Sequence, residues 1–177
     1  MRGLPTFLSL LTLASPALAQ VHAQTPGPGW IVDAASGCKA WNAFPEPDES
    51  ISWSGPCVGG VAEGWGVLQW YRAGQPADRF TGRLQKGKHD GWGIYAFANG
   101  DVYAGGWRDG AFHDHGLYID ADGNRYEGEF RNGRAEGMGT RWDADGSVLT
   151  GVWTNGCLRH DDEMVSVGWT AWKCGFK

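Results

Sequence analysis

Histidines are the clearest of the few side chains in this sequence that could do chemistry. His113 and His115 flank Asp114, so an extended backbone would place both imidazoles on one face and the carboxylate on the other. Such groups bind transition metals, but a stable site needs three or four converging ligands. Only two are supplied locally, because His89 and His160 lie beside other predicted turns. We therefore expect no metal site, and we interpret His115 as part of a semi-apolar column.

The carboxylates and hydroxyls give no candidate for catalysis. Asp120 with Asp122, and Asp143 with Asp145, recur 23 residues apart beside turn signals, and turn formation explains them better than acid–base chemistry. The segment 160–163, in which three acidic residues follow His160, fits a solvated turn, although such a cluster could hold a cation. The chain has no Gly-x-Ser-x-Gly motif and no phosphate-binding glycine loop that opens a helix. We expect no enzyme activity, no catalytic residue and no cofactor.

The N-terminal residues have the pattern of a secretory signal peptide over residues 1–19. A basic start precedes an apolar stretch at 4–13, and an Ala-x-Ala sequence ends at Ala19. The apolar stretch is too short to span a bilayer as a helix. We expect cleavage before Gln20, with a second candidate site after Ala23, and a mature chain in a periplasmic or extracellular space.

The four cysteines are expected to form disulfide bonds, because an even count in an exported chain favours pairing over metal binding or catalysis. Three connectivities are possible. We favour Cys38 with Cys57 and Cys157 with Cys174, since each pair closes a short loop and would contribute about 3 kcal/mol in the chain-entropy model. Each bond would fasten a terminal segment to the body of the protein.

The composition indicates a globular chain rather than a disordered one. Of 177 residues, 20% are charged and 13% are aromatic, and the formal net charge is −5. The negative balance argues against a nucleic-acid partner. Glycine is abundant, with 29 residues, but its spacing is not the strict three-residue repeat of collagen.

Glycine and aromatic residues instead recur every 23 residues through the middle of the chain. The glycine columns are Gly82, Gly105, Gly128 and Gly151; Gly87, Gly110, Gly133 and Gly156; Gly93, Gly116 and Gly139; and Gly100, Gly123 and Gly146. Two apolar columns keep the same step: Phe80, Tyr103, Tyr126 and Leu149; and Leu84, Trp107, Phe130 and Trp153. An earlier copy begins at Trp53, with an insertion that we expect to lengthen the loop around residues 73–78. Recurrence at one spacing predicts a repeat architecture.

Each repeat has the local signals of a β-hairpin. Residues 125–131 alternate polar and apolar side chains, which is typical of a strand. Asn132-Gly133 then predicts a two-residue turn. A simple two-residue hairpin would place Gly128 opposite Gly137 and Tyr126 opposite Gly139, so that the tyrosine ring lies flat over glycine.

The odd length of the repeat constrains the other turn. Two even loops in a 23-residue unit would send equivalent residues of successive repeats to opposite faces. One loop must therefore be odd or bulged. We predict three-residue loops with a left-handed glycine at 98–100, 121–123 and 144–146.

These residues resemble the MORN repeat family, whose pattern is an aromatic residue, x-Gly, four residues, Gly, three residues, and Gly-x-Gly. Residues 126–139 match it fully, whereas the preceding unit has Asp114 in place of a glycine. The resemblance extends over about residues 53–156. The whole chain resembles an exported bacterial protein that contains MORN repeats. This resemblance implies an all-β, elongated antiparallel meander used for protein association, scaffolding or membrane-surface attachment.

The predicted organisation is a signal peptide (1–19), an N-terminal cap (20–50), MORN-like hairpins (51–156) and a C-terminal cap (157–177). A one-layer sheet cannot bury both of its faces, and both carry apolar side chains here. The candidate binding residues are Trp92, Trp107, Trp142, Tyr103, Tyr118 and Tyr126.

Four interpretations of the sheet surface stay open at this point. A protein partner or a second copy could cover one of them, or the terminal segments with Trp30, Trp41, Trp169 and Trp172 could do so. The exposed aromatic residues could instead bind a cell-envelope glycan. A lipid surface could attach through the basic residues at 79–88.

Overall fold

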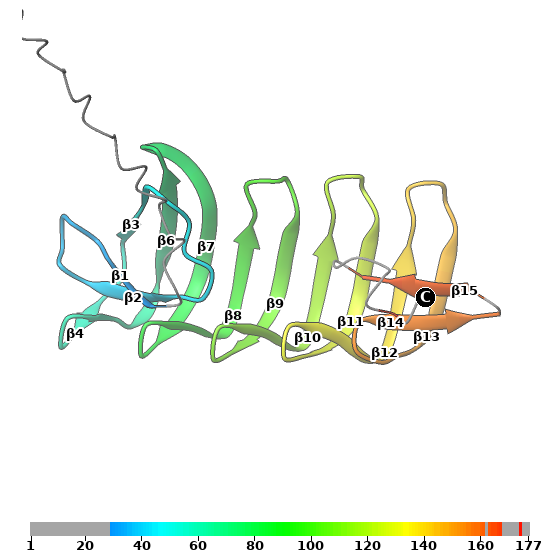
Figure 1. Ribbon diagram of the computed structural model, residues 1–177. Helices are drawn as coiled ribbons and strands as arrows, with labels where there is room; N and C mark the ends of the chain where they lie inside the picture. The colour runs from blue at the N-terminus through cyan, green and yellow to red at the C-terminus, as the bar shows by residue number, and fades with distance from the viewer. Residues whose placement is uncertain (1–28, 162, 168–173, 175–177) are drawn as a thin grey trace, which may run out of the picture.

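The computed structural model describes residues 29–161, 163–167 and 174, and this part of the chain is nearly all β (Figure 1). The predicted signal peptide, Trp169 and Trp172 lie outside the described residues. A nine-stranded antiparallel sheet has the order β13-β12-β11-β10-β9-β8-β7-β6-β3. Its strands are β3 (Glu49–Trp53), β6 (Gly64–Arg72), β7 (Gln75–Gln85), β8 (Lys88–Ala96), β9 (Val102–Arg108), β10 (Ala111–Ile119), β11 (Arg125–Arg131), β12 (Arg134–Trp142) and β13 (Val148–Trp153).

The loops between β8 and β9, β10 and β11, and β12 and β13 are the predicted three-residue loops. In the last of them, the Gly146 N–H donates to the Asp143 carbonyl at 2.9 Å, and the Asp143 N–H donates to the Ser147 carbonyl at 2.9 Å. Gly146 adopts φ of +93°, and Gly100 and Gly123 have the same left-handed conformation. The odd loop therefore keeps equivalent residues of successive repeats on the same face, as the repeat length requires.

The pairing predicted for the short hairpins is wrong. Gly128 pairs with Gly139, and Tyr126 pairs with Arg141. Close to the Asn132-Gly133 turn the register is the simple two-residue one, but a bulge between Gly128 and Phe130 shifts it further along the strands. Two residues more on β12 than on β11 produce this shift, with Gly137 at φ of +79° inside the bulge.

The same bulge recurs in each repeat at the column of Gly91, Asp114 and Gly137. All three residues have positive φ, with Asp114 at +58°. The departure from the glycine pattern at Asp114 therefore changes the residue but not the backbone conformation. An aspartate tolerates this region better than most non-glycine residues.

The insertion near residue 73 does not make a longer loop, in contrast to the prediction. Ala73 and Gly74 form a two-residue turn with φ of +48° and +75°, and β6 and β7 extend up to it. Pro76 pairs with Tyr71 inside this longer hairpin. Two consecutive positive φ angles match the right-handed twist of the strands, so the tight turn survives and the inserted residues lengthen the strands.

Backbone hydrogen bonds join the short turns of successive repeats. The turn glycine of each repeat donates its N–H to a carbonyl 21 or 25 residues earlier in the chain. These pairs are Gly87 to Ala62, Gly110 to His89, Gly133 to Phe112 and Gly156 to Ala135, at 2.8–2.9 Å. Figure 1 shows these turns in a row along one edge of the array. They add a second ladder of hydrogen bonds to that of the sheet itself.

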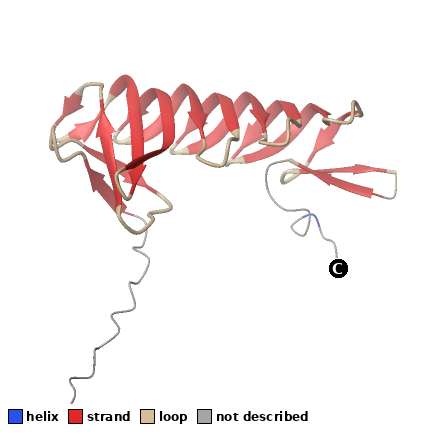
Figure 2. Cartoon of the chain, turned by 90° about the horizontal axis from the view of Figure 1, so that it is seen from above, coloured by secondary structure: helices blue, strands red, loops and turns tan. Residues whose placement is uncertain are grey.

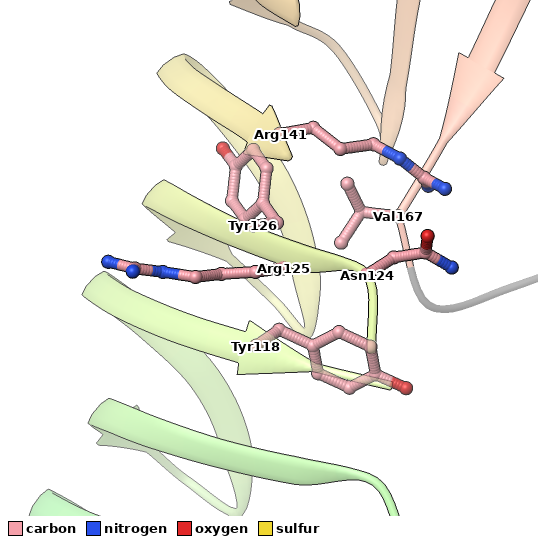
Figure 3. A pocket seen from close by; sticks show the side chains of 6 residues that line it. All are labelled: Tyr118, Asn124, Arg125, Tyr126, Arg141 and Val167. Atoms are coloured by element: carbon pink, nitrogen blue, oxygen red, sulfur yellow. The ribbon is translucent and has the colours of Figure 1, made fainter. Parts of the chain in front are cut away.

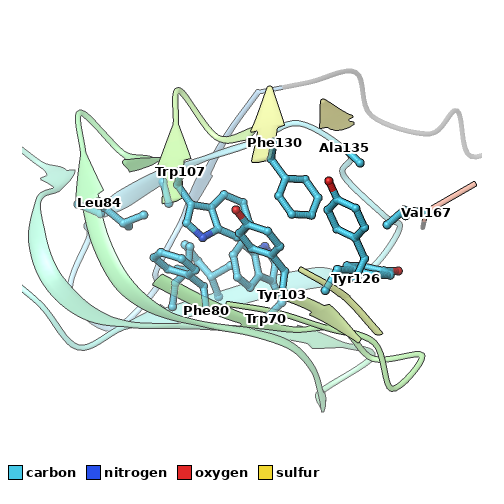
Figure 4. Close-up of a cluster of buried hydrophobic side chains, with 14 of the residues drawn as sticks. Trp70, Phe80, Leu84, Tyr103, Trp107, Tyr126, Phe130, Ala135 and Val167 are labelled. Carbon is cyan, nitrogen blue, oxygen red and sulfur yellow. The ribbon is translucent and has the colours of Figure 1, made fainter. Parts of the chain in front are cut away.

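The hydrophobic core lies on one face of the long sheet, which we call the inner face (Figure 4). Its middle row is glycine, and aromatic rings fold over that row from both sides. A Cβ on Gly139 would lie 2.3 Å from the Tyr126 hydroxyl oxygen, and a Cβ on Gly93 would lie 2.3 Å from the Phe80 ring. The expectation that glycine leaves room for flat rings is confirmed, although each ring covers a glycine pair diagonal to it.

The inner face also carries the second aromatic column. The indole N–H of Trp107 donates to the Gly93 carbonyl at 3.2 Å, and that of Trp153 donates to the Gly139 carbonyl at 3.1 Å. Phe112 stacks on Tyr103 with ring centroids 3.8 Å apart. The core is thus a continuous aromatic stack that runs across the repeats, because each ring contacts those of its neighbours.

Terminal segments close the inner face at its two ends (Figure 2). At the N-terminal end lies a small sheet of order β1-β2-β5-β4, and at the other end lies the β14–β15 hairpin. The Trp41 N–H donates to the Gly87 carbonyl, and the Val167 N–H donates to the Gly156 carbonyl, so both segments continue the ladder of short turns. The bounds are β1 (Gly29–Val32), β2 (Lys39–Asn42), β4 (Cys57–Val58), β5 (Val61–Ala62), β14 (Cys157–His160) and β15 (Glu163–Ser166).

The cysteines pair as favoured from the sequence. Cys38 lies at disulfide distance from Cys57, and Cys157 lies at disulfide distance from Cys174. The first bond joins β4 to the loop before β2, and the second joins β14 to the end of the chain. Each terminal segment is therefore fastened covalently within itself, next to the end repeat that it covers.

Candidate functional site: the outer face of the sheet

The second face of the long sheet, which we call the outer face, keeps large apolar side chains in contact with solvent. Its most exposed row crosses the sheet beside the bulges. Trp65 on β6 is 61% exposed, Trp92 on β8 is 53% exposed and Met138 on β12 is 54% exposed. Val152 pairs with Met138 and is also exposed. Nothing in the described part of the chain covers these side chains.

Arg83 lies in the same row, between the two exposed indoles. It pairs directly with Trp65, and its side chain runs beside Gly91, the residue before Trp92. The three residues occupy adjacent strands, so the backbones at Trp65 and Trp92 are about 10 Å apart, at two strand spacings. Arg83 makes no hydrogen bond or ion pair with any residue that the structure describes.

A second outer row is apolar at its centre. Ile94 pairs with Ala104, and Ala104 pairs with Leu117. Ile94 is exposed, whereas Ala104 and Leu117 are half-buried. Together with Trp92, these residues form an apolar patch over β8, β9 and β10.

Four of the six candidate binding residues are not available at the surface. Tyr103, Tyr126, Trp107 and Tyr118 are each less than 8% exposed, because the bulged hairpins and the aromatic stack enclose them. Burial raises the pKa of Tyr103, Tyr118 and Tyr126 well above the ordinary tyrosine value. These residues are core rather than a binding face.

The other two candidates lie on the outer face. Trp92 is the exposed indole described above. Trp142 is half-buried, because the Arg125 guanidinium lies over its ring at 4.8 Å from the centroid. Arg125 in turn forms an ion pair with Glu127. Trp142 is therefore already engaged within its own sheet, and the accessible aromatic side chains of the outer face are Trp65 and Trp92.

The histidines that the structure describes are not grouped with other possible metal ligands. His113 binds through both ring nitrogens: Nδ1 is 2.9 Å from Asp114, and Nε2 is 3.1 Å from Arg108. His115 is exposed on the outer face in the column of Trp92 and Met138. Within the described residues, no three histidine, cysteine, aspartate or glutamate side chains are grouped in a way that could hold a metal ion.

His89 lies on β8 with its ring in the aromatic core, and not in a turn as the sequence indicated. Its ring packs in an aromatic cage, with centroids 4.2 Å from Phe80 and 4.7 Å from Trp107 and with Trp70 and Tyr95 further out. Its Nε2 atom is buried and has no hydrogen-bond partner among the described residues. Burial lowers the pKa of His89 to about 3, so the imidazole is neutral at ordinary pH. Its position pairs with Leu84 on the inner face, which explains the burial.

Two hollows lie in the described part of the chain, one small and one open to solvent. One of about 10 Å³, roughly the room for a single water molecule, lies between Tyr118, Tyr126, Arg141 and Val167 (Figure 3). A larger open hollow at the N-terminal end is lined by Trp30, Asn42 and Glu49 among others. There the Asn42 amide donates to the Glu49 carboxylate at 2.5 Å. The polar groups of this hollow already bind one another.

The basic residues at 79–88 do not form a single patch. Arg79 and Arg83 lie on the outer face of β7, but Lys86 is in the short turn with φ of +50°. Lys88 forms an ion pair with Asp109 at 3.7 Å and lies over the Trp41 ring. The four basic side chains are therefore divided between the outer face and the edge of the sheet with the short turns. No helix in the described part of the chain is long and apolar enough to cross a bilayer.

The fold and this face define a class: tandem β-hairpin repeats with a buried aromatic face and an open outer face. The MORN repeat model matches three consecutive units, residues 80–102, 103–125 and 126–148. The resemblance expected from the sequence extended to residues 53–156, and the long sheet itself spans β3 to β13. No matching curated protein was found.

Proposed function

We propose that this chain is a non-enzymatic interaction or scaffolding module whose outer face docks another protein. The observation that carries the proposal is the outer row in which Trp65 and Trp92 stand exposed on either side of Arg83. Tryptophan and arginine are the residue types most enriched at the energetic centres of protein interfaces. The inner aromatic residues are already buried, so of the two faces of the long sheet the outer one remains open to a partner.

The MORN match supports the same class of function. Repeats of this family are generally modules for protein or membrane interaction and are non-enzymatic. The divided basic residues favour a protein over a lipid surface as the partner of this chain. A cell-envelope glycan stacked on Trp65 and Trp92 is the alternative occupant of the same row.

We further propose that the protein is exported from a bacterial cell to a periplasmic or extracellular space. The two cysteine pairs at disulfide distance are typical of an oxidising compartment. The signal-peptide pattern at residues 1–19 agrees with this. Secretion of the full-length chain with loss of mass at residue 19 or 23, measured by mass spectrometry, tests the export.

The docking proposal is tested by photo-crosslinking in the cell that makes the protein. A benzophenone amino acid is placed at position 94 on the outer face and, as a matched control, at position 122 in an exposed loop. We expect protein adducts from position 94 and none from position 122. Absence of protein adducts from position 94, together with retention of the chain on insoluble envelope glycan, would replace protein docking with glycan binding.

A further inference from the structure

The long sheet ends at β13 in an edge strand whose outward backbone groups have no partner among the described residues. At the loop before β13, the Asp143 N–H donates to the Ser147 carbonyl, so Ser147 bonds toward β12. The direction of bonding alternates along an antiparallel strand, and every second residue after Ser147 therefore bonds to β12 as well. The N–H and C=O groups of the residues between them face away from the sheet. These residues are Val148, Thr150 and Val152.

The chain leaves the sheet where the next strand would cover this edge. Thr154 continues the outward-facing series and exchanges two hydrogen bonds with Cys157, at 2.8 and 3.0 Å. Beyond that turn, β14 pairs with β15 and not with β13. Leu158 packs under the inner face, where a Cβ on Gly151 would lie 2.7 Å from it. The last repeat thus lacks the strand that β8, β10 and β12 supply to the earlier ones.

This edge has none of the usual protection against pairing with another chain. Native edge strands are commonly blunted by charged side chains, by proline or by a covering segment. Among the described strands of the long sheet, only β13 has no charged residue. Val148 and Val152 are 53% and 64% exposed. At the opposite edge, by contrast, the Asp33 carboxylate accepts the outward N–H of Trp53 on β3 at 3.3 Å.

The inner side of the β13 edge is also apolar and incompletely covered. Leu149 stands in the column of Tyr103 and Tyr126. Both tyrosines are almost completely buried, and the Tyr126 ring covers a glycine of its own strand and one of the strand that follows. Leu149 is only half-buried, since no strand follows it. A strand added to β13 would therefore cover apolar side chains on both faces of the sheet.

The β14–β15 hairpin gives this edge an acidic neighbour. The hairpin lies on the inner side of the sheet and reaches past β13, as two views show (Figure 1 and Figure 2). Residues 161–163 at its far end are all acidic, and the side chain of the first is 90% exposed. Arg159 points away from the sheet because it alternates with Leu158, and Arg141 is paired with Asp143. An added strand would therefore pass beside an acidic surface on its inner side.

We propose that β13 receives an extended segment of another protein as a tenth strand of the long sheet. The backbone of this segment bonds to the outward groups of Val148, Thr150 and Val152, as in other complexes formed by strand addition. Its apolar side chains cover the two valines, and a basic side chain on its inner side meets the acidic end of the β14–β15 hairpin. This edge is separate from the outer face, so the inference goes beyond the docking function proposed above.

A second copy of the chain fits this edge less well. A two-fold axis that joins β13 to β13 is perpendicular to the sheet, so both acidic hairpin ends would lie on the same side of the joint. β13 itself offers no basic side chain to either end. A basic strand from a different protein satisfies the backbone groups, the valines and the acidic hairpin together.

The test uses a defined peptide and its N-methylated forms, with binding to the purified oxidised chain measured by fluorescence anisotropy. The peptide has seven residues, with lysine at both ends and valine and threonine alternating between them. One form is methylated at the valine amides and the other at the threonine amides. Only one of these sets of N–H groups can face β13 in an added strand. We expect one form to bind as the parent peptide does, and the other to bind about tenfold more weakly or worse.

Matched variants change one position of β13. Thr150→Pro removes an outward N–H that has no partner in the described chain, and proline is tolerated at such edge positions. This variant should bind the peptide about tenfold more weakly. Thr150→Val keeps the N–H and loses the same hydroxyl, which lies 2.9 Å from that of Thr140, so it should bind normally. A peptide with glutamate at both ends should bind about two- to threefold more weakly than the lysine peptide, and Asp161→Asn should reduce that difference.

Each contrary outcome overturns part of the proposal. No binding of the lysine peptide, equal binding of its two methylated forms, or equal binding by Thr150→Pro and Thr150→Val would exclude the added strand. Equal affinity for the lysine and glutamate peptides would exclude a basic partner. A dimer of the chain alone that Thr150→Pro dissociates, seen by sedimentation velocity, would put a second copy at this edge instead.

Two controls keep these outcomes separate. Thermal melts show whether each variant keeps the fold, and the methylated peptides test the wild-type chain even where Thr150→Pro does not fold. Protein adducts from position 94 report on the outer face alone. Failure of the added strand together with persistent adducts would leave the docking function standing.

Discussion

The hydroxyl of Tyr118 donates a hydrogen bond to the Asp101 carboxylate, with 2.5 Å between the two oxygens. The other oxygen of that carboxylate accepts the backbone N–H of Ala121 at 2.9 Å. Asp101 belongs to one repeat and Ala121 to the loop of the next, so a single carboxylate joins two repeats. The arrangement recurs, because Asp78 accepts the N–H of Ala98 at 2.7 Å.

Replacement of Asp101 by alanine is expected to lower the free energy of unfolding by about 1–3 kcal/mol, since Ala121 and Tyr118 both lose their acceptor. Asp101→Asn should lose less, because Asn124 already fills the equivalent place in the next repeat and accepts the Ala144 N–H at 3.0 Å. Urea denaturation compares the two variants. Equal losses would show that the bridge to the next loop is not what stabilises this position.

The hydrogen bonds at Asp101 also set its ionisation. Burial alone would raise the pKa of this carboxyl, but hydrogen bonds from Tyr118, Asn99 and Ala121 outweigh burial and hold the pKa below its ordinary value. The stabilisation is therefore fully present above the ordinary aspartate pKa and is lost as the pH falls through the lowered value.

A second prediction concerns the inner glycine row. Gly139→Val would place side-chain atoms where the Tyr126 ring lies, and overpacking of this kind costs about 1–3 kcal/mol. The melting temperature should fall by several degrees. Met138→Val, at the preceding residue on the outward side, is the matched control and should leave the melt nearly unchanged, because that side chain is 54% exposed. Equal melts for the two variants would contradict the packing of rings over glycine.

A third prediction concerns His89 and acid. The folded pKa is about 3 and the ordinary histidine value is about 6.5, so below pH 6.5 the unfolded chain binds a proton that the folded chain excludes. Stability should therefore fall between pH 6.5 and 3, by up to about 1.4 kcal/mol per pH unit.

The variant His89→Phe should remove this part of the pH dependence, and Phe112 already occupies the equivalent position one repeat later. His115→Gln, on the exposed outer face, is the control and should keep the wild-type slope. Stability measured by urea denaturation from pH 7 to pH 4 makes the comparison. The same slope in the wild-type and His89→Phe chains would contradict the neutral, buried imidazole.

A fourth prediction concerns the disulfide at the N-terminal end. Cys38→Ala with Cys57→Ala removes one covalent loop of 19 residues, which is expected to cost about 3 kcal/mol. Because the small sheet β1-β2-β5-β4 covers one end of the aromatic stack, the loss should appear first as exposure of Trp41, which is half-buried. Tryptophan fluorescence during denaturation reports this. If the fluorescence of the variant changes at the same denaturant concentration as that of the wild type, the cap does not depend on the disulfide bond.

The hairpin fold could be predicted from the sequence because the residue types at each turn determine the conformation of that turn. Asn132-Gly133 and Ala144-Asp145-Gly146 each specify a loop of fixed length, and the odd repeat length fixed their combination. The bulge at Gly137 could not be derived in this way, because a glycine in a strand signals several conformations equally well. The wrong strand register followed from that one residue.

The candidate site was harder to predict. Alternation separates the two faces of a strand but does not say which face the protein buries. Tyr103 and Trp92 are both aromatic residues in alternating strands, yet the first is enclosed by the aromatic stack and the second is open. His89 had no signal of burial, because its neighbours Lys88 and Asp90 resemble a solvated turn. Phe112 occupies the same position one repeat later, and this aromatic equivalent was the one indication that His89 is buried.

The proposed function requires that the outer face, and not the inner face, is the surface that binds a partner. Hydroxyl-radical footprinting with mass spectrometry measures this directly, on the dilute purified chain and on the same chain in its native assembly. We predict that Trp65, Trp92 and Met138 are oxidised in the dilute chain and protected in the assembly, while Trp107 is protected in both. Equal oxidation of Trp65 and Trp92 in the two samples would contradict the claim.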